Sequence, residues 1–275
     1  MRRWIRGALL AAAVAAVAVY ALLPVVWAAG TSLKAGSAIF DPALFPAHPA
    51  WSNYAAVFRE QPFGRNILNS LLAAGATTVA SLLLGLLAAY ALGRHRFRGR
   101  QAVLYTFLGA SMFPQIALLS GLFELIRSLG LYDRWEGLAL SYLIFTLPFT
   151  VWVLTAFLRE LPPSLDEAAR LDGAGPLTIL FRVLLPALGP TLAATGLLAF
   201  IAAWNEFLFA LTFTLSDAGR TVPVALAQMS GSSQFELPWG RLMAASLVVT
   251  APTVVLALAF QRRIVAGLTA GSVKG

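Results

Sequence analysis

Side chains that support catalysis are scarce in this chain. Cysteine is absent, and the two histidines, His48 and His95, lie in polar connecting segments without a partner at metal-ligand spacing. These counts exclude disulfides, thiolate metal sites and cysteine nucleophiles. We therefore predict no catalytic residue and no metal site. The informative residues are expected to bind other molecules instead.

One polar segment has fixed spacing and stands between two long apolar runs. It begins with Glu167-Ala168-Ala169, continues to Asp172 and Gly173, and nine residues later reaches Val183, followed by Leu185-Pro186. A polar stretch of this length between apolar runs has to be explained by something outside the bilayer. We interpret it as a contact surface for another protein.

The first part of this segment is predicted to be a short helix. Ser164 stands at an expected N-cap with Glu167 three residues on, the capping-box pattern. Asp166 and Glu167 lie where the helix dipole favours negative charge. Gly173 is expected to end the helix in a conformation that other residues resist.

A second short helix is predicted to begin at Pro176, which suits a first turn, and to break at Pro186. The alternative is that Glu167 is only a capping residue. That alternative explains Ser164 and Glu167 but not the spacing out to Pro186, so we favour the contact role.

The composition places most of the chain in a membrane. Hydrophobic residues are 59% of 275 and charged residues 12%, against roughly 45–50% and 25% in soluble proteins. The fold class is therefore all-α membrane protein. Six apolar runs are long enough to cross the hydrocarbon, approximately 8–29, 67–93, 102–123, 137–158, 188–211 and 242–260. A polar loop, 159–187, and a tail, 261–275, complete a single domain over 1–275.

The basic residues indicate an orientation. Thirteen of the 20 Lys and Arg lie on the side of the two termini and of the 159–187 loop, and seven lie on the other side. By the positive-inside rule both termini are cytoplasmic. A cleaved signal peptide is the alternative for the first run, but about 22 apolar residues exceed the 7–15 of a signal h-region.

Small residues recur at every fourth position of the second run: Ala73, Thr77, Ser81, Gly85, Ala89 and Gly93. In lipid, small residues allow close helix packing. We favour ordinary tight packing over a helix that slides against its neighbours.

Glu206 is the only acidic residue inside a proposed span, and it follows Trp204 and Asn205. Because a carboxylate inside the bilayer is costly, it should face protein or water. Three interpretations stay open: contact with solute, a hydrogen bond that braces a moving helix, or snorkelling toward the outer interface. The candidate residues of the solute route are Trp204, Asn205, Glu206, Tyr142 and Gln115.

The chain resembles the permease family of carbohydrate ABC importers. The resemblance rests on the E-A-A…G…L-P spacing, on W-N-E at Trp204-Asn205-Glu206, on G-S-S-Q-F-E from Gly231, and on the tail G-L-T-A-G-S-V-K-G from Gly267. Val183 stands where the family more often has Ile. The resemblance covers essentially the whole chain and is particularly close to the trehalose-importing permeases of mycobacteria.

This resemblance implies the type I importer permease fold with a cytoplasmic coupling loop. The implied ATPase-coupling residues are Glu167, Ala168, Ala169, Asp172, Gly173, Val183, Leu185 and Pro186. The implied tail contacts to the ATPase are Gly267, Leu268, Thr269, Gly271 and Lys274, and a loop probing the binding protein comprises Gly231, Ser232, Ser233 and Gln234.

The implied partners are a second homologous permease, two ATPase subunits and an extracytoplasmic binding protein. No phosphate-loop sequence occurs here, so ATP and magnesium are expected on the ATPase partners and no cofactor on this chain.

The solute is expected to be a disaccharide such as trehalose, with maltose-type sugars next. The runner-up is an ion-gradient-driven secondary transporter, which predicts ionisable groups near the midplane and repeated halves. Nucleic acid is not an expected partner.

Overall fold

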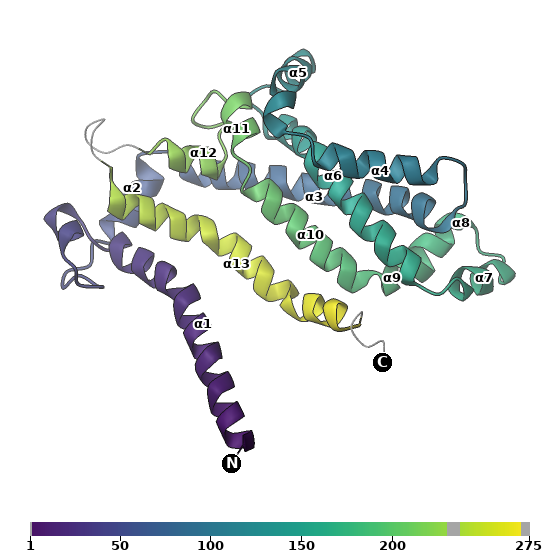
Figure 1. The fold of residues 1–275 in the computed structure, drawn as a ribbon. Coiled ribbons are helices and arrows are strands. Elements are labelled where there is room, and N and C mark those ends of the chain that lie inside the picture. Colours follow the sequence, from purple (N-terminus) through teal and green to yellow (C-terminus); the bar gives the residue numbers. More distant parts are fainter. Residues whose placement is uncertain (1, 230–236, 271–275) are drawn as a thin grey trace. The chain divides into compact units, whose positions relative to one another are not determined.

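The computed structural model describes residues 2–229 and 237–270, and the side chains of 6–229 and 237–261. Every regular element in these ranges is helical (Figure 1), which confirms the all-α prediction. We predicted one domain, and the chain divides into two compact units. Unit 1 comprises 1–64 and 225–251, and unit 2 comprises 65–224 and 252–275. Each unit is described by itself.

Unit 1 contains α1 (Arg2–Ser32), the 3-10 helix η1 (Gly36–Phe40), α2 (Ser52–Arg59) and the first part of α13 (Trp239–Ala270). The buried side chain of Asn53 holds the end of α1, because its Nδ2 donates to the carbonyl oxygens of Ser32 at 2.8 Å and Lys34 at 2.9 Å. Glu60 and Arg241 form an ion pair between α2 and α13.

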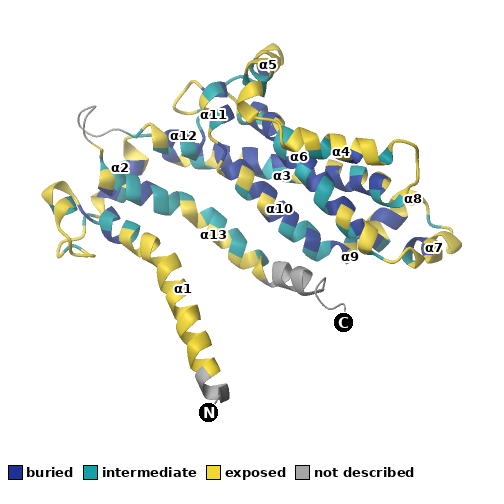
Figure 2. Cartoon of the chain, in the orientation of Figure 1, coloured by how far each residue is buried: buried dark blue, intermediate teal, exposed yellow. Residues whose placement is uncertain are grey.

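The apolar surface of α1 is left uncovered by protein. None of its most apolar window is buried (Figure 2), and large side chains from Leu9 to Trp27 are exposed. Exposed apolar area of this extent is unfavourable in water. A lipid environment removes that cost, so α1 has the surface of a helix that faces hydrocarbon.

Unit 2 is built around α6 (Trp135–Glu160). It packs against α4 (Arg100–Ser111) and α10 (Gly189–Trp204) (Figure 1). The long helix α3 (Phe63–Arg94) also contacts α6. The helices α5 (Gln115–Ser128) and α11 (Leu208–Phe213) pack against α6 and against each other. The remaining elements are α7 (Ser164–Leu171), α8 (Pro176–Thr178), the π-helix η2 (Ile179–Leu184), α9 (Leu185–Ala187) and α12 (Val222–Ala227).

The small residues of α3 lie against α6. The Oγ atom of Ser81 is 2.7 Å from Oγ1 of Thr146, and both side chains are buried. At Gly85 a Cβ would lie 2.6 Å from Cγ2 of Thr150, so only glycine lets the two helices approach this closely. These contacts favour the tight-packing interpretation of the small-residue row.

Among the described residues, four helices are long and apolar enough to cross a membrane by themselves: Arg6–Ser32, Phe63–Arg94, Trp135–Glu160 and Trp239–Gln261. Two further pairs, Arg100–Ser111 with Gln115–Ser128 and Pro176–Ala187 with Gly189–Trp204, are bent by 94° and 83°. The six-span count is reached if each bent pair forms one span.

The third and fifth predicted apolar runs are not continuous helices in the structure. The run 102–123 is divided between α4 and α5, because Pro114 lacks a backbone N–H and adopts an extended ψ of 120° before α5. The run 188–211 is interrupted after Trp204, where Asn205 ends α10 and α11 begins only at Leu208.

Candidate functional site

The predicted contact segment forms two short helical pieces joined by a tight turn. α7 ends at Leu171, and Gly173 follows with φ of +79°. Only glycine adopts this region without strain, apart from occasional Asn or Asp. The prediction for Gly173 is confirmed.

The predicted capping box is wrong. Pro163 is the N-cap, Ser164 is already the first helical residue, and no side chain caps the helix. The fixed φ of proline starts the helix early. The first N–H groups are satisfied instead by proline carbonyls, since Leu165 donates to Pro162 and Asp166 to Pro163. Glu167 is thereby left exposed.

The second piece begins at Pro176 as predicted, but Pro186 does not break it. The π-helical stretch Ile179–Leu184 precedes Pro186 directly. In a regular α-helix the proline ring would clash with the carbonyl four residues earlier, and the wider π turns relieve that clash. The chain bends instead at Leu188, between α9 and α10.

A buried ion pair ties α7 to α3. Nε of Arg94 lies 3.2 Å from Oδ2 of Asp166, and the two side chains are only 8% and 9% exposed. Nη1 of Arg94 also donates to the carbonyl of Leu161 at 3.0 Å. Sequence reasoning missed this pair, since it assigned Asp166 only to the helix dipole. The signal was a basic residue at the end of the second predicted span and an acidic residue in the 159–187 loop, which is predicted to lie on the same side of the membrane.

The inner side of the segment is seated on the helices of unit 2. A buried apolar cluster contains side chains from α3, α6, α7 and the π-helical piece: Leu86, Ala89, Tyr90, Leu154, Leu158, Ala169, Ile179, Leu180, Leu184 and Leu188. Because close-packed interiors have low compressibility, a displacement of this segment would also displace α3 and α6.

The outer side of the same segment is uncovered (Figure 2). Of the predicted coupling residues, Glu167, Ala168, Asp172, Gly173 and Pro186 are exposed, Val183 and Leu185 are half-buried, and Ala169 is buried. Three apolar side chains that sequence reasoning did not single out are also exposed there, namely Leu171 at 89%, Leu177 at 63% and Phe181 at 41%. We call Leu171, Leu177 and Phe181 the apolar contact face. Exposed large apolar side chains on an otherwise polar segment are typical of a protein interface.

Glu206 braces the junction between α10 and α11. Its carboxylate accepts hydrogen bonds from the backbone N–H of Phe209 at 2.8 Å and of Ala210 at 3.0 Å. The residue is buried. These contacts satisfy the free N–H groups of the first turn of α11, so the structure favours the bracing interpretation over snorkelling toward an interface.

The other candidate residues of the solute route do not form one site. Tyr142 is 1% exposed, and its hydroxyl interacts electrostatically with the Glu206 carboxylate. Trp204 is buried and stacks on Phe200, whereas Asn205 and Gln115 are exposed. Only Tyr142 and Glu206 are thus brought together.

Replacing Glu206 with leucine is expected to lower the free energy of unfolding by about 2 kcal/mol, because two buried N–H groups lose their acceptors. Glu206→Gln keeps one acceptor oxygen and should lose about half as much. Thermal unfolding of the detergent-solubilised chain measures both, with the exposed Glu124→Gln as control. Unchanged stability with a weakened affinity for solute would instead assign Glu206 to solute binding.

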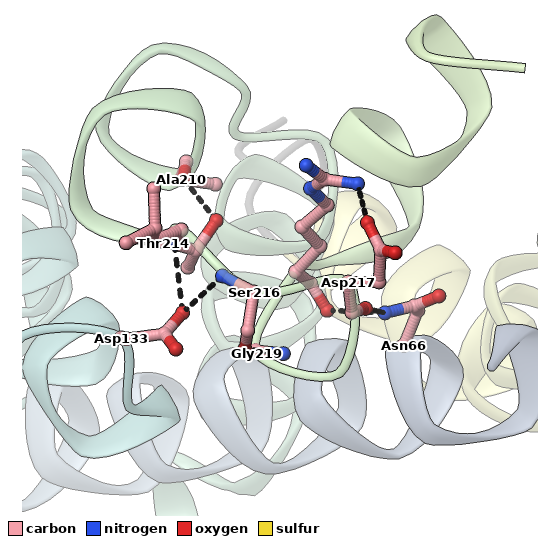
Figure 3. Close-up of polar contacts among 9 residues, drawn as sticks. Asn66, Asp133, Ala210, Thr214, Ser216, Asp217 and Gly219 are labelled. Atoms are coloured by element: carbon pink, nitrogen blue, oxygen red, sulfur yellow. Dashed lines mark hydrogen bonds and ion pairs between the residues drawn. The ribbon is translucent and has the colours of Figure 1, made fainter. Parts of the chain in front are cut away.

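A second polar cluster holds the segment that follows α11 (Figure 3). Oδ1 of Asp133, a residue with φ of +60°, accepts from the backbone N–H of Leu215 at 2.8 Å and Ser216 at 3.1 Å. From α3, Nδ2 of Asn66 donates to the carbonyl of Asp217 at 2.7 Å. Nδ2 of Asn69, one turn further along α3, donates to the carbonyl of Ala218 at 2.7 Å. Sequence reasoning missed this cluster, although Asn66, Asn69 and Ser70 share one helix face at the start of a span.

The predicted binding-protein loop, Gly231, Ser232, Ser233 and Gln234, lies outside the described residues, as do Gly271 and Lys274 of the tail. Gly267, Leu268 and Thr269 belong to α13, without described side chains. The contacts predicted for these residues stay predictions.

Bent apolar helices packed around α6, with an anchored polar segment at one end, are the architecture of a membrane-embedded protein. Residues 81–269 match the family of binding-protein-dependent transport system inner membrane components, and the chain belongs to that family. The match disfavours the ion-driven transporter.

Curated relatives agree with this assignment. The trehalose transport system permease protein SugB of Mycobacterium tuberculosis is 44% identical over 93% of both chains. The trehalose/maltose transport system permease protein MalG of Thermococcus litoralis is 40% identical over 94% of this chain and 93% of its own.

The fold is also that of a solved structure, a chain of a bacterial ABC transporter involved in the import of the acidic polysaccharide alginate. The TM-score is 0.78, with 24% identity over 94% of this chain and 96% of that one. A second structure, of a bacterial alginate ABC transporter in complex with a pentasaccharide-bound periplasmic protein, gives a TM-score of 0.68 with 16% identity, over 94% of this chain and 93% of that one.

Proposed function

We propose that this chain is the permease subunit of an ATP-driven importer and that it carries a disaccharide such as trehalose across the membrane. The observation that carries the coupling part of this proposal is the two-sided segment 164–187. Its inner side is anchored on α3 and α6 by the Arg94–Asp166 pair and the apolar cluster, and its outer side exposes the apolar contact face. It can therefore pass a partner's movement to the spans.

The partner at this surface is proposed to be an ATPase subunit. Glu167 and Asp172 supply exposed carboxylates beside the apolar contact face, so a partner with a hydrophobic cleft and basic rim would fit it. Two ATPase subunits, carrying ATP and magnesium, would act on this chain and on a second homologous permease. The tail residues Gly267, Leu268, Thr269, Gly271 and Lys274 are proposed to contact the same ATPases.

The proposed orientation places both termini and the segment 164–187 in the cytoplasm. It rests on the excess of basic residues on that side, thirteen against seven. On the opposite side, a binding protein would deliver the solute, and the loop Gly231, Ser232, Ser233 and Gln234 is proposed to reach into it.

The choice of a neutral sugar rests on the relatives and on the chemistry of the spans. SugB and MalG are named for trehalose and for trehalose and maltose transport. A polyhydroxyl solute is recognised by hydrogen-bonding groups and aromatic faces, and Asn205 and Gln115 are exposed to offer the former. An anionic solute would call for basic residues inside the spans, and none stands well inside a predicted span.

Reconstituted complexes that contain this chain, its partner permease, the ATPases and the binding protein are expected to take up labelled trehalose, and maltose more weakly. The uptake should require ATP hydrolysis. Labelled maltose, a labelled amino acid and a labelled phosphate ester are offered in parallel uptake assays. Uptake of the amino acid or the phosphate ester without any sugar uptake would overturn the proposed substrate class.

A further inference from the structure

The end of α3, the start of α4 and α7 lie at one end of unit 2 (Figure 1). Side chains from these elements and from the end of α6 line a strongly basic hollow there. Its volume is about 360 Å³. Five arginines and two carboxylates contribute to its walls: Arg94, Arg96, Arg100, Arg159, Arg170, Asp166 and Glu167. The positive charges exceed the negative ones by three, so the hollow attracts anions.

The two carboxylates of this hollow do not neutralise all five of its arginines. The ion pair of Arg94 with Asp166 uses one guanidinium edge, and Nη2 of Arg94 is buried without a hydrogen-bond partner in the described part of the chain. Arg100 and Arg159 lie close enough for their charges to repel each other. A buried donor without an acceptor is costly, and an anion in the hollow would remove that cost.

Phosphate is the anion that suits these donors. Guanidinium groups bind phosphate oxygens through paired, charge-assisted hydrogen bonds. The donors come from two parts of the chain. Arg96 and Arg100 lie just before and at the start of α4, whereas Arg159 lies in the last turn of α6 and Arg170 in the last turn of α7.

Apolar surface continues directly from the hollow. On and before α4, Phe97, Val103 and Tyr105 are 47%, 41% and 57% exposed, and Tyr105 is near enough to interact with Arg159. Aromatic side chains beside basic ones are typical of the level of lipid headgroups. A ligand with a phosphate and an acyl chain would use both surfaces, whereas a soluble phosphate would use only the first.

We propose that this hollow binds the phosphate headgroup of an anionic phospholipid, whose acyl chain lies along α4. The proposal rests on the proposed membrane orientation, which places the hollow at the cytoplasmic leaflet, where anionic lipids attract basic residues. Bound there, the lipid would join the α3–α4 connection to α7 and stabilise the segment that the proposed ATPase contacts.

Native mass spectrometry of the full chain in mild detergent tests this. We expect phosphatidylglycerol to be retained in preference to phosphatidylcholine. The triple variant Arg96→Gln/Arg100→Gln/Arg170→Gln should weaken phosphatidylglycerol binding about a hundredfold, and Arg96→Gln alone about fivefold. If the triple variant does not fold, the fivefold loss in Arg96→Gln still tests whether these arginines bind the lipid.

The matched control removes the same charge from exposed arginines elsewhere, as Arg59→Gln/Arg65→Gln/Arg127→Gln, and should leave binding unchanged. Equal retention of the two lipids, equal loss in the control, or displacement of the lipid by inorganic phosphate would overturn the proposal. So would a triple variant that keeps the lipid but no longer co-purifies with the ATPase, because the hollow would then serve that partner. Since lipid retention is measured without transport, its failure leaves the transport proposal to be judged by uptake.

Discussion

Replacing Asp166 with alanine is expected to lower the free energy of unfolding by about 3 kcal/mol. The substitution leaves the guanidinium of Arg94 buried at 8% exposure without its carboxylate. It also releases α7 from α3, so solute-stimulated ATP hydrolysis by the reconstituted complex should fall much further than basal hydrolysis. Thermal unfolding in detergent and the two hydrolysis rates measure these effects.

Glu167→Ala is the matched control for stability, since this neighbouring carboxylate is exposed and forms no ion pair among the described residues. The double variant Arg94→Met/Asp166→Leu should recover most of the lost stability, because replacing both members of a buried pair by apolar residues is often neutral. If Asp166→Ala and Glu167→Ala unfold at the same temperature, the ion pair does not anchor the segment.

Gly173→Val is expected to uncouple hydrolysis from transport while leaving membrane insertion intact. The φ of +79° is strained for any residue with a β-branched side chain, by about 2 kcal/mol. No atom lies within 4 Å of an added Cβ, so the cost is purely conformational. The turn should open and displace the apolar contact face from its partner. Co-purification of the ATPase and solute-stimulated hydrolysis measure the change.

Gly173→Asn separates backbone strain from the loss of glycine itself. Asparagine tolerates positive φ, so this variant should assemble and hydrolyse ATP nearly as the unsubstituted chain does, with Gly173→Ala in between. Equal activity in Gly173→Val and Gly173→Asn would remove the turn from the coupling role.

Sequence periodicity and composition were enough to predict the membrane class, the helical fold and the contact segment. Long apolar runs have only one solution in lipid that satisfies their backbone, so helices at 8–29, 67–93, 137–158 and 242–260 were predictable from length alone. Gly173 was predictable because a positive φ selects one residue type. The family resemblance added the prediction that this segment contacts an ATPase.

Tertiary structure decided where these helices bend and which polar groups meet. The apolar runs 102–123 and 188–211 are broken although their hydropathy is continuous, because bends at Pro114 and after Trp204 depend on the neighbours that satisfy the freed backbone groups. Glu206 is such a neighbour, since it supplies the acceptors for the first turn of α11. Local sequence shows that a carboxylate is present but not which N–H groups it faces.

The same reason accounts for the Arg94–Asp166 pair and the hollow beside it. These residues are 72 positions apart, and a pairing over such a distance leaves no periodic signal in one sequence. The membrane class, the long apolar helices and the turn at Gly173 were thus determined by the sequence alone. The partners of its buried charges were decided only when the folded helices brought distant segments together and removed water from between them.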